Sequence, residues 1–194
     1  MTRPYRKRRR AELEEETRRR ITQATMELHE LVGPAQTTVS AIAERAGVQR
    51  ATVYRHFPDD TALITACSAH WMMLNPAPDI AAWAAIGDVD ERLRTALAEL
   101  YAWYERTETM VELLNRDRGS VPALDERLRL RDAYFAAALE TLLRGRPERG
   151  GRRRRARGAI AHALEFETWR SLVRHQGLAQ SEAVELLARL VAAA

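Results

Sequence analysis

The sequence is poor in several features that define other classes of protein. Its 194 residues include one cysteine, Cys67, so neither an internal disulfide framework nor a four-ligand zinc cluster can form. Cys67 lies in an apolar run, which favours a buried small side chain over a reactive thiol. No run of about 18 apolar residues predicts a membrane-spanning helix, and no apolar stretch follows the basic N-terminus as in a signal peptide. We therefore expect a cytoplasmic protein with no membrane partner.

Motifs of enzymatic chemistry are missing as well. There is no phosphate-binding loop, no Gly-rich dinucleotide turn and no HExxH sequence. His162 and Glu165 are one helical turn apart, a spacing open to a metal pair or, more simply, to an exposed polar pair. We expect no enzyme, no cofactor and no bound metal.

The composition predicts helices. Beta-branched residues are sparse, whereas Ala, Leu, Glu and Arg dominate, and the 46% of apolar residues suffices for a core. The charge is uneven: residues 1–57 hold 12 Lys and Arg against seven Asp and Glu, and the remainder holds 19 against 20. This asymmetry indicates a polyanion partner for the N-terminal part, although a basic tail could also be only a solubilising extension.

Periodicity and breakers divide the chain into three parts. Residues 1–10 are expected to form a disordered basic arm, 11–57 an N-terminal domain of three helices, and 58–194 a second helical domain. The first four helices are expected at about 12–32, 39–46, 50–57 and 60–74, with Thr38 capping the second and Asp59 or Asp60 the fourth. Asn75-Pro76-Ala77-Pro78 predicts a break in the helical chain and a change of sub-domain. Further helices are expected at about 79–86, 89–106, 108–117, 122–144, 154–175 and 181–193, with a loop at 145–155.

The second and third helices have the features of a helix-turn-helix. Ala43 and Ala46 are small where the helices would cross, and Gly47 accepts the positive φ of the turn. Val48 and Val53 are expected to point inward. An ordinary helical hairpin would share these features.

The remaining side chains of the third helix suit a DNA groove. Arginine can donate two hydrogen bonds to guanine, hydroxyl groups reach phosphates, and an alanine methyl can touch a thymine methyl. These outward side chains are Arg50, Ala51, Thr52, Tyr54, Arg55 and His56.

Residues 37–58, TTVSAIAERAGVQRATVYRHFP, resemble the DNA-binding signature of the TetR family of bacterial transcriptional regulators. The similarity covers about 50 residues, from Ile21 to roughly Leu63. It implies phosphate contacts for Thr38 and His56, and backbone and base-edge contacts for Tyr54. Contacts to bases and flanking phosphates are implied for Gln49, Arg50, Ala51 and Thr52, and Arg55 is also included among the DNA-binding residues. Asp60 stands where family members commonly carry a phosphate-binding lysine, and Ser40 replaces a basic residue found in some relatives.

The C-terminal part is expected to form a homodimer, because helix-turn-helix regulators bind paired half-sites. The closing helices carry wide apolar surfaces, and the last two long helices form the dimer interface in the family. An intramolecular core would explain the same pattern. The candidate interface residues are Ile160, Leu164, Trp169, Leu172, Val184, Leu187, Leu190 and Val191.

The resemblance also implies a small-molecule pocket that shifts the DNA-binding part when filled. Aromatic walls with a few polar groups suit such a pocket, although aromatic residues at helical spacing are often plain core. The candidates are His70, Trp71, Trp83, Tyr101, Tyr104 and Tyr134.

The sequence therefore predicts an all-α regulator that binds double-stranded operator DNA, acting as a repressor released by an unidentified effector. The alternative is a nonspecific nucleic-acid-binding or scaffold protein that uses the basic arm and the arginines at 152–155. Such a protein would bind with salt dependence but without sequence preference.

Overall fold

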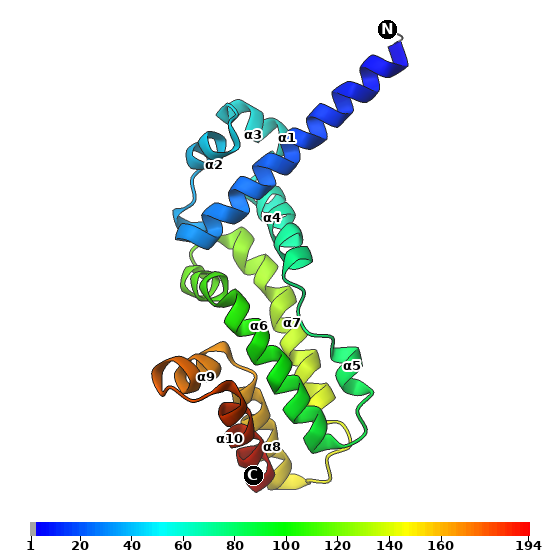
Figure 1. The fold of residues 1–194 in the computed structure, drawn as a ribbon, viewed down its shortest axis with the longest axis vertical. Coiled ribbons are helices and arrows are strands. Elements are labelled where there is room, and N and C mark those ends of the chain that lie inside the picture. The colour runs from blue at the N-terminus through cyan, green and yellow to red at the C-terminus, as the bar shows by residue number, and fades with distance from the viewer. Residues whose placement is uncertain (1–2) are drawn as a thin grey trace. The chain divides into compact units, whose positions relative to one another are not determined.

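A computed structural model describes the backbone of residues 3–194 and the side chains from Lys7 onward. The described chain is helical and holds no strand. Its elements are α1 (Arg3–Val32), η1 (Pro34–Gln36), α2 (Val39–Ala46), α3 (Arg50–His56), α4 (Asp60–Leu74), α5 (Ile80–Ala84), α6 (Val89–Asp117), α7 (Pro122–Leu143), α8 (Gly150–Ala163), α9 (Phe166–Arg170), η2 (Ser171–His175) and α10 (Gln180–Ala193) (Figure 1). No described helix is long and apolar enough to cross a membrane.

The chain divides into two compact units. The first, called the head, comprises Met1–Asn75 and Glu112–Leu128, and the second, called the body, comprises Pro76–Val111 and Arg129–Ala194. The division after Asn75 coincides with the Pro-containing break, whereas the sequence placed the domain boundary at residue 57. The difference arises because α4 packs against α1 and contributes Leu63 to the core of the head.

The head is built around one apolar cluster to which four helices contribute. Ile21 of α1, Ile42 of α2 and Val53 of α3 are each at most 2% exposed. Phe57, directly after α3, is equally buried, and Ala43 and Ala46 let α2 approach its neighbours closely. Burial of one large apolar side chain contributes roughly 1.5–3 kcal/mol to the stability of the fold. This cluster therefore fixes the positions of α2 and α3 against α1.

The first helix begins earlier than the sequence predicted. Residues 1–10 were expected to form a disordered arm, but α1 starts at Arg3; residues 1–2 lie outside the described part of the chain. Arg8 pairs with Glu12 at 2.9 Å and Arg10 with Glu14 at 3.0 Å, and such pairs four residues apart stabilise a helix. The expectation of disorder considered only repulsion among the basic residues and overlooked the glutamates one turn later.

Helix boundaries in the body also differ from the prediction. One helix, α6, replaces the two expected at 89–106 and 108–117, and α8 starts at Gly150, inside the expected loop. The helix expected at 154–175 is broken, because Glu165 has an extended backbone between α8 and α9. A π-helical turn, η2, follows α9.

Candidate nucleic-acid interface

Gly47 makes the turn between α2 and α3 possible. Its φ of 64° is left-handed, and the N–H of Val48 donates to the Ala43 carbonyl at 2.9 Å. Glycine adopts this conformation without the steric cost that a Cβ would bring. The turn therefore brings α3 to the surface within three residues of the end of α2, as the sequence predicted.

Helix α3 has one buried side and one open side. Val53 is 1% exposed and anchors the helix, while Tyr54 is 49% exposed. Thr52 and His56 are partly buried, so they border the open side. The exposed residues here are Gln49, Arg50, Ala51, Tyr54 and Arg55. Most of the side chains predicted to contact DNA thus lie on one short helix whose opposite side is anchored in the core, with Gln49 at its N-cap.

Thr38 combines two properties at the start of α2. It is exposed, and its Oγ1 accepts a hydrogen bond from the N–H of Ala41 at 3.1 Å. This is the capping role that the sequence predicted. Since the hydroxyl keeps its own proton, Thr38 can also donate to a phosphate.

Two cations on α3 are available to a ligand. Within the described part of the chain, neither Arg50 nor Arg55 forms an ion pair or hydrogen bond through its side chain. An arginine without an internal partner loses no existing interaction when it binds an anion or a guanine edge.

Arg18 of α1 is a residue that sequence reasoning missed. Its guanidinium lies 4.2 Å from the centre of the Phe57 ring, and Nη1 donates to the His56 carbonyl at 2.7 Å. A cation at the end of a helix satisfies a free carbonyl and complements the helix dipole. The His56 carbonyl is 38 residues away in sequence, so no local pattern could have shown this contact.

The comparisons with known proteins agree with this geometry. The family described as "Bacterial regulatory proteins, tetR family" matches residues 21–67, which span α1 from Ile21, all of α2 and α3, and the first half of α4. Residues 21–67 are therefore those of a TetR-family DNA-binding domain. Its helix-turn-helix is accordingly a DNA-binding one, and the family resemblance predicted from residues 37–58 is confirmed.

Two curated relatives of this chain carry the name of repressors. The chain is 29% identical over 135 residues to the "HTH-type transcriptional repressor KstR" of Mycolicibacterium smegmatis, covering 66% of each protein. It is 27% identical to the protein of the same name from Mycobacterium tuberculosis, covering 66% of this chain and 61% of that protein. The match therefore spans slightly under two thirds of each relative's length.

Solved structures show the same fold. A TetR-like transcriptional regulator from Rhodococcus sp. RHA1 aligns with a TM-score of 0.64 and 17% identity, over 90% of this chain and 93% of that one. A TetR-family regulator from Streptomyces coelicolor aligns with a TM-score of 0.63 and 21% identity, over 92% and 80% respectively. The likeness extends over both units and confirms the predicted all-α class.

The residues predicted to line an effector pocket are divided between the two units. His70 and Trp71 belong to the head, where His70 Nε2 lies 2.8 Å from Gln23 Oε1 and Trp71 Nε1 donates to Glu30 at 3.0 Å. The other four belong to the body. Trp83 is fully buried and donates to Glu99 at 2.7 Å. Tyr134 donates to the Pro78 carbonyl at 2.9 Å.

Tyr101 and Tyr104 form hydrogen bonds at the C-terminal end of α8. The Tyr101 hydroxyl donates to the Ala163 carbonyl at 3.0 Å, and the Tyr104 hydroxyl donates to the Leu164 carbonyl at 2.6 Å. Burial raises the pKa of both hydroxyls, so both remain protonated donors. These tyrosines satisfy carbonyls that a continuous helix would have bonded internally.

An aromatic cluster surrounds Tyr104 in the body. Its ring centre lies 5.3 Å from that of Phe166 and 5.8 Å from that of Trp169. Trp169 is fully buried, and its indole nitrogen has no acceptor among the described residues. A buried N–H without a partner is costly, which distinguishes this donor from the satisfied tyrosines.

Most of the predicted dimer residues are core residues of the single chain. Ile160 and Trp169 are fully buried, and Leu164, Val184, Leu187 and Val191 are at most 7% exposed. Leu172 is partly exposed and Leu190 is 50% exposed. These six residues are therefore buried within the protomer, where α8 and α10 pack against each other, and their part in a dimer interface stays a prediction.

Proposed function

We propose that this protein is a sequence-specific repressor of the TetR family that reads operator DNA with α3. The observation that carries the proposal is the contrast between Val53, which is 1% exposed, and the open side of α3, which presents unpaired Arg50 and Arg55. A rigidly anchored helix with outward polar and cationic groups can enter a major groove. The repressor names of the two curated relatives support negative regulation.

We propose that the protein binds DNA as a homodimer and that the exposed side of α10 forms the contact between the two subunits. Leu186 is 47% exposed and Leu190 is 50% exposed, and residues four apart lie on one face of a helix. A second copy of the chain would cover this apolar face by two-fold symmetry. Light scattering should give the mass of a dimer, and L186E/L190E should give the mass of a monomer.

We propose that a small molecule bound in the body releases the DNA. The aromatic cluster around Tyr104 provides apolar surface, and the Trp169 N–H offers a donor for a ligand oxygen. Such a molecule must bind the conformation with low DNA affinity more tightly than the other. Quenching of Trp169 fluorescence in a ligand screen, lost in W169F, would locate this site.

Selection of bound duplexes from a random pool tests the DNA-reading function. A dimer presents two heads to the DNA, so a palindromic consensus with half-sites about one helical turn apart is expected. Enrichment of no sequence, with affinity that depends only on salt, would instead support the nonspecific nucleic-acid-binding alternative.

A further inference from the structure

Arg20 differs from its two neighbours on α1. Arg18 is bound to the His56 carbonyl and Arg19 is paired with Glu16, whereas Arg20 makes no hydrogen bond or ion pair with any residue whose side chain the structure describes. Arg20 is also exposed. Its charge is therefore not used to hold the fold.

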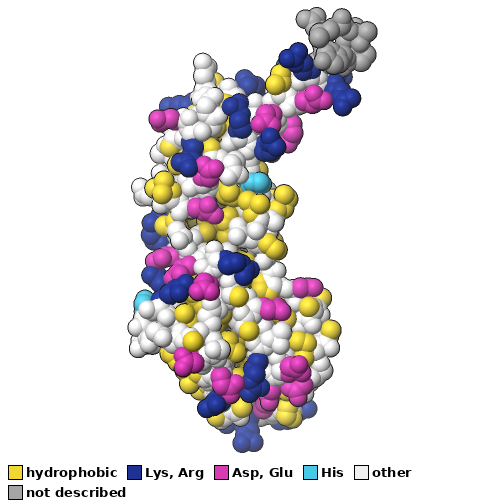
Figure 2. Space-filling model, viewed as in Figure 1, with side chains coloured by type: hydrophobic (Ala, Val, Ile, Leu, Met, Phe, Trp, Pro, Cys, Tyr) yellow, Lys and Arg dark blue, Asp and Glu magenta, His cyan; other side chains and the backbone are white. Residues whose placement is uncertain are grey.

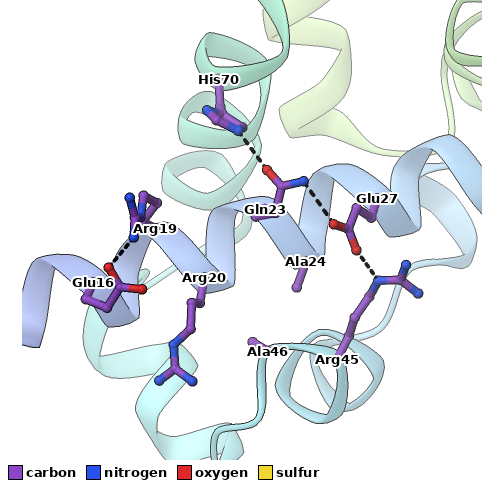
Figure 3. Close-up of a pocket in the computed structure, with 9 residues that line it drawn as sticks. All are labelled: Glu16, Arg19, Arg20, Gln23, Ala24, Glu27, Arg45, Ala46 and His70. Carbon is purple, nitrogen blue, oxygen red and sulfur yellow. Dashed lines mark hydrogen bonds and ion pairs between the residues drawn. The ribbon is translucent and has the colours of Figure 1, made fainter. Parts of the chain in front are cut away.

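Arg20 borders a hollow of about 430 Å³ on the surface of the head, formed by α1, α2 and α4 (Figure 3). The side chains in its wall that can carry charge are Glu16, Arg19, Arg20, Glu27, Arg45 and His70.

Both carboxylates in this wall already have cationic partners. Glu16 is paired with Arg19, and Glu27 accepts from Arg45 at 2.5 Å. A hydrogen bond from Gln23 and the Arg45 guanidinium lower the pKa of Glu27, so it stays ionised and keeps its partner. Arg20 is thus the cation in the wall whose charge is not balanced by a neighbouring carboxylate.

The Arg20 guanidinium reaches the turn that leads into α3. A Cβ placed on Gly47 would lie 3.9 Å from Arg20 Nη1. In Figure 3 the side chain points away from His70, toward the side of α1 where Arg45 and Ala46 lie. Gly47 is two residues before Gln49, the N-cap of α3. Arg20 is therefore close to the N-terminal end of α3, the helix proposed to enter the groove.

We propose that Arg20 binds a phosphate of the DNA backbone beside the groove occupied by α3. The inference rests on the proposed DNA-reading function and adds a contact that anchors the head without reading a base. A guanidinium can donate two parallel hydrogen bonds to phosphate oxygens, and the open hollow leaves the planar group accessible. Because every duplex presents phosphates, this contact is independent of sequence.

The test measures duplex affinity against salt concentration for Arg20→Ala, Arg20→Lys and Arg19→Ala, using both a random duplex and the selected operator. Arg20→Ala should weaken binding to both duplexes by the same factor, about three- to tenfold at low salt, and lower the salt slope by about 1. Arg20→Lys should retain most of the slope, since lysine still offers a point charge. Equal melting temperatures would show that the head remains folded.

Arg19→Ala is the matched control, because it removes the same charge one residue away and frees Glu16. An effect of Arg19→Ala as large as that of Arg20→Ala would reduce the role of Arg20 to long-range electrostatics and overturn the proposal. Titration with inorganic phosphate forms a second arm. Saturable phosphate binding that Arg20→Ala abolishes, with an unchanged DNA salt slope, would assign the site to a free anion and also overturn it. If no operator emerges but the slope still falls, the phosphate contact stands and sequence-specific reading fails.

Discussion

Asp117, at the end of α6, holds the turn that precedes α2: its Oδ2 accepts a hydrogen bond from the backbone N–H of Ala35 at 2.9 Å. Arg116 adds a second link by donating from Nη2 to the Val32 carbonyl at 2.7 Å and from Nε to Asp117 at 2.7 Å. Burial by itself would raise the pKa of Asp117, but the bonds from Arg116 and Ala35 keep it below its usual value. The carboxylate therefore stays charged, and the turn before α2 is held by a residue 82 positions away in sequence.

Gly33→Ala should disrupt this contact. Gly33 has φ of 86° and ψ of 161°, a region open almost only to glycine, and a Cβ there would lie 2.4 Å from both Arg116 Nη2 and Asp117 Oδ2. The free energy of unfolding should fall by roughly 1–3 kcal/mol from backbone strain alone. Urea denaturation measures the loss. Gly119→Ala is the control, because Gly119 also has a positive φ but a Cβ there meets nothing within 4 Å. Equal losses in both variants would show that the clash with Arg116 and Asp117 adds nothing.

Thr38 substitutions should separate helix capping from phosphate binding. Thr38→Ala removes both and should cost about 1 kcal/mol of stability together with DNA affinity. Thr38→Asp keeps an oxygen that caps α2, so stability should be retained, but its charge repels a phosphate and DNA binding should weaken further. Melting curves and DNA titrations of the two variants provide the comparison. Undiminished DNA affinity in Thr38→Asp would place the phosphate elsewhere.

Arg50→Ala should weaken operator binding by roughly 1–3 kcal/mol and relax the preference at one base pair in each half-site, if Arg50 donates to guanine. Binding to random duplex should change less. Arg153→Ala removes a charge from an exposed position of α8 in the body and serves as the control. Titrations against single-base operator variants measure discrimination, and an unaltered pattern would show that Arg50 does not read a base.

Arg18→Ala should destabilise the head without changing the base preference. It removes the stacking on Phe57 and the hydrogen bond to the His56 carbonyl, which together contribute roughly 1–3 kcal/mol. Arg9→Ala is the control, since Arg9 is exposed on the same helix. Hydrogen exchange of the α3 amides should accelerate in Arg18→Ala and not in Arg9→Ala. Unchanged protection of α3 would show that Arg18 does not anchor it.

His29 should make stability depend on pH. Burial lowers its pKa to about 4, partly opposed by the charge of Asp117, so the folded head holds a neutral imidazole. Its Nδ1 lies 3.5 Å from the Cys67 sulfur, and burial raises the pKa of that thiol to about 12, so the thiol stays protonated beside the neutral imidazole. The unfolded chain takes up the proton first, near pH 6.5. Stability should therefore be full above about pH 6.5 and fall as the pH drops toward 4, by up to roughly 3 kcal/mol.

Urea midpoints between pH 7 and pH 4 measure this dependence in the native protein and in His29→Gln. Loss of stability on acidification should be smaller in the variant by the His29 contribution. His175→Gln, at an exposed position of the body, should leave the profile unchanged. If His29→Gln follows the native profile, other groups account for the acid sensitivity.

The N-terminal end of α1 carries oppositely charged side chains at helical spacing. Its side chains are exposed from Lys7 to Glu16, and Figure 2 shows basic and acidic side chains side by side on this segment. The pairs Arg8–Glu12 and Arg10–Glu14 are written in the sequence at helical spacing, so the helix could have been predicted from them.

The sequence by itself determined the helix-turn-helix formed by α2 and α3. Thr38 caps α2, Gly47 ends it and Pro58 follows α3, and each acts within a few residues, so the boundaries of α2 and α3 could be predicted to within one residue. Only the tertiary structure decided what the body residues do. Tyr101 and Tyr104 bond to carbonyls at least 60 positions away, and the apolar faces of α8 and α10 cover each other. A periodic apolar pattern shows that a face is buried, but its partner depends on how distant segments pack.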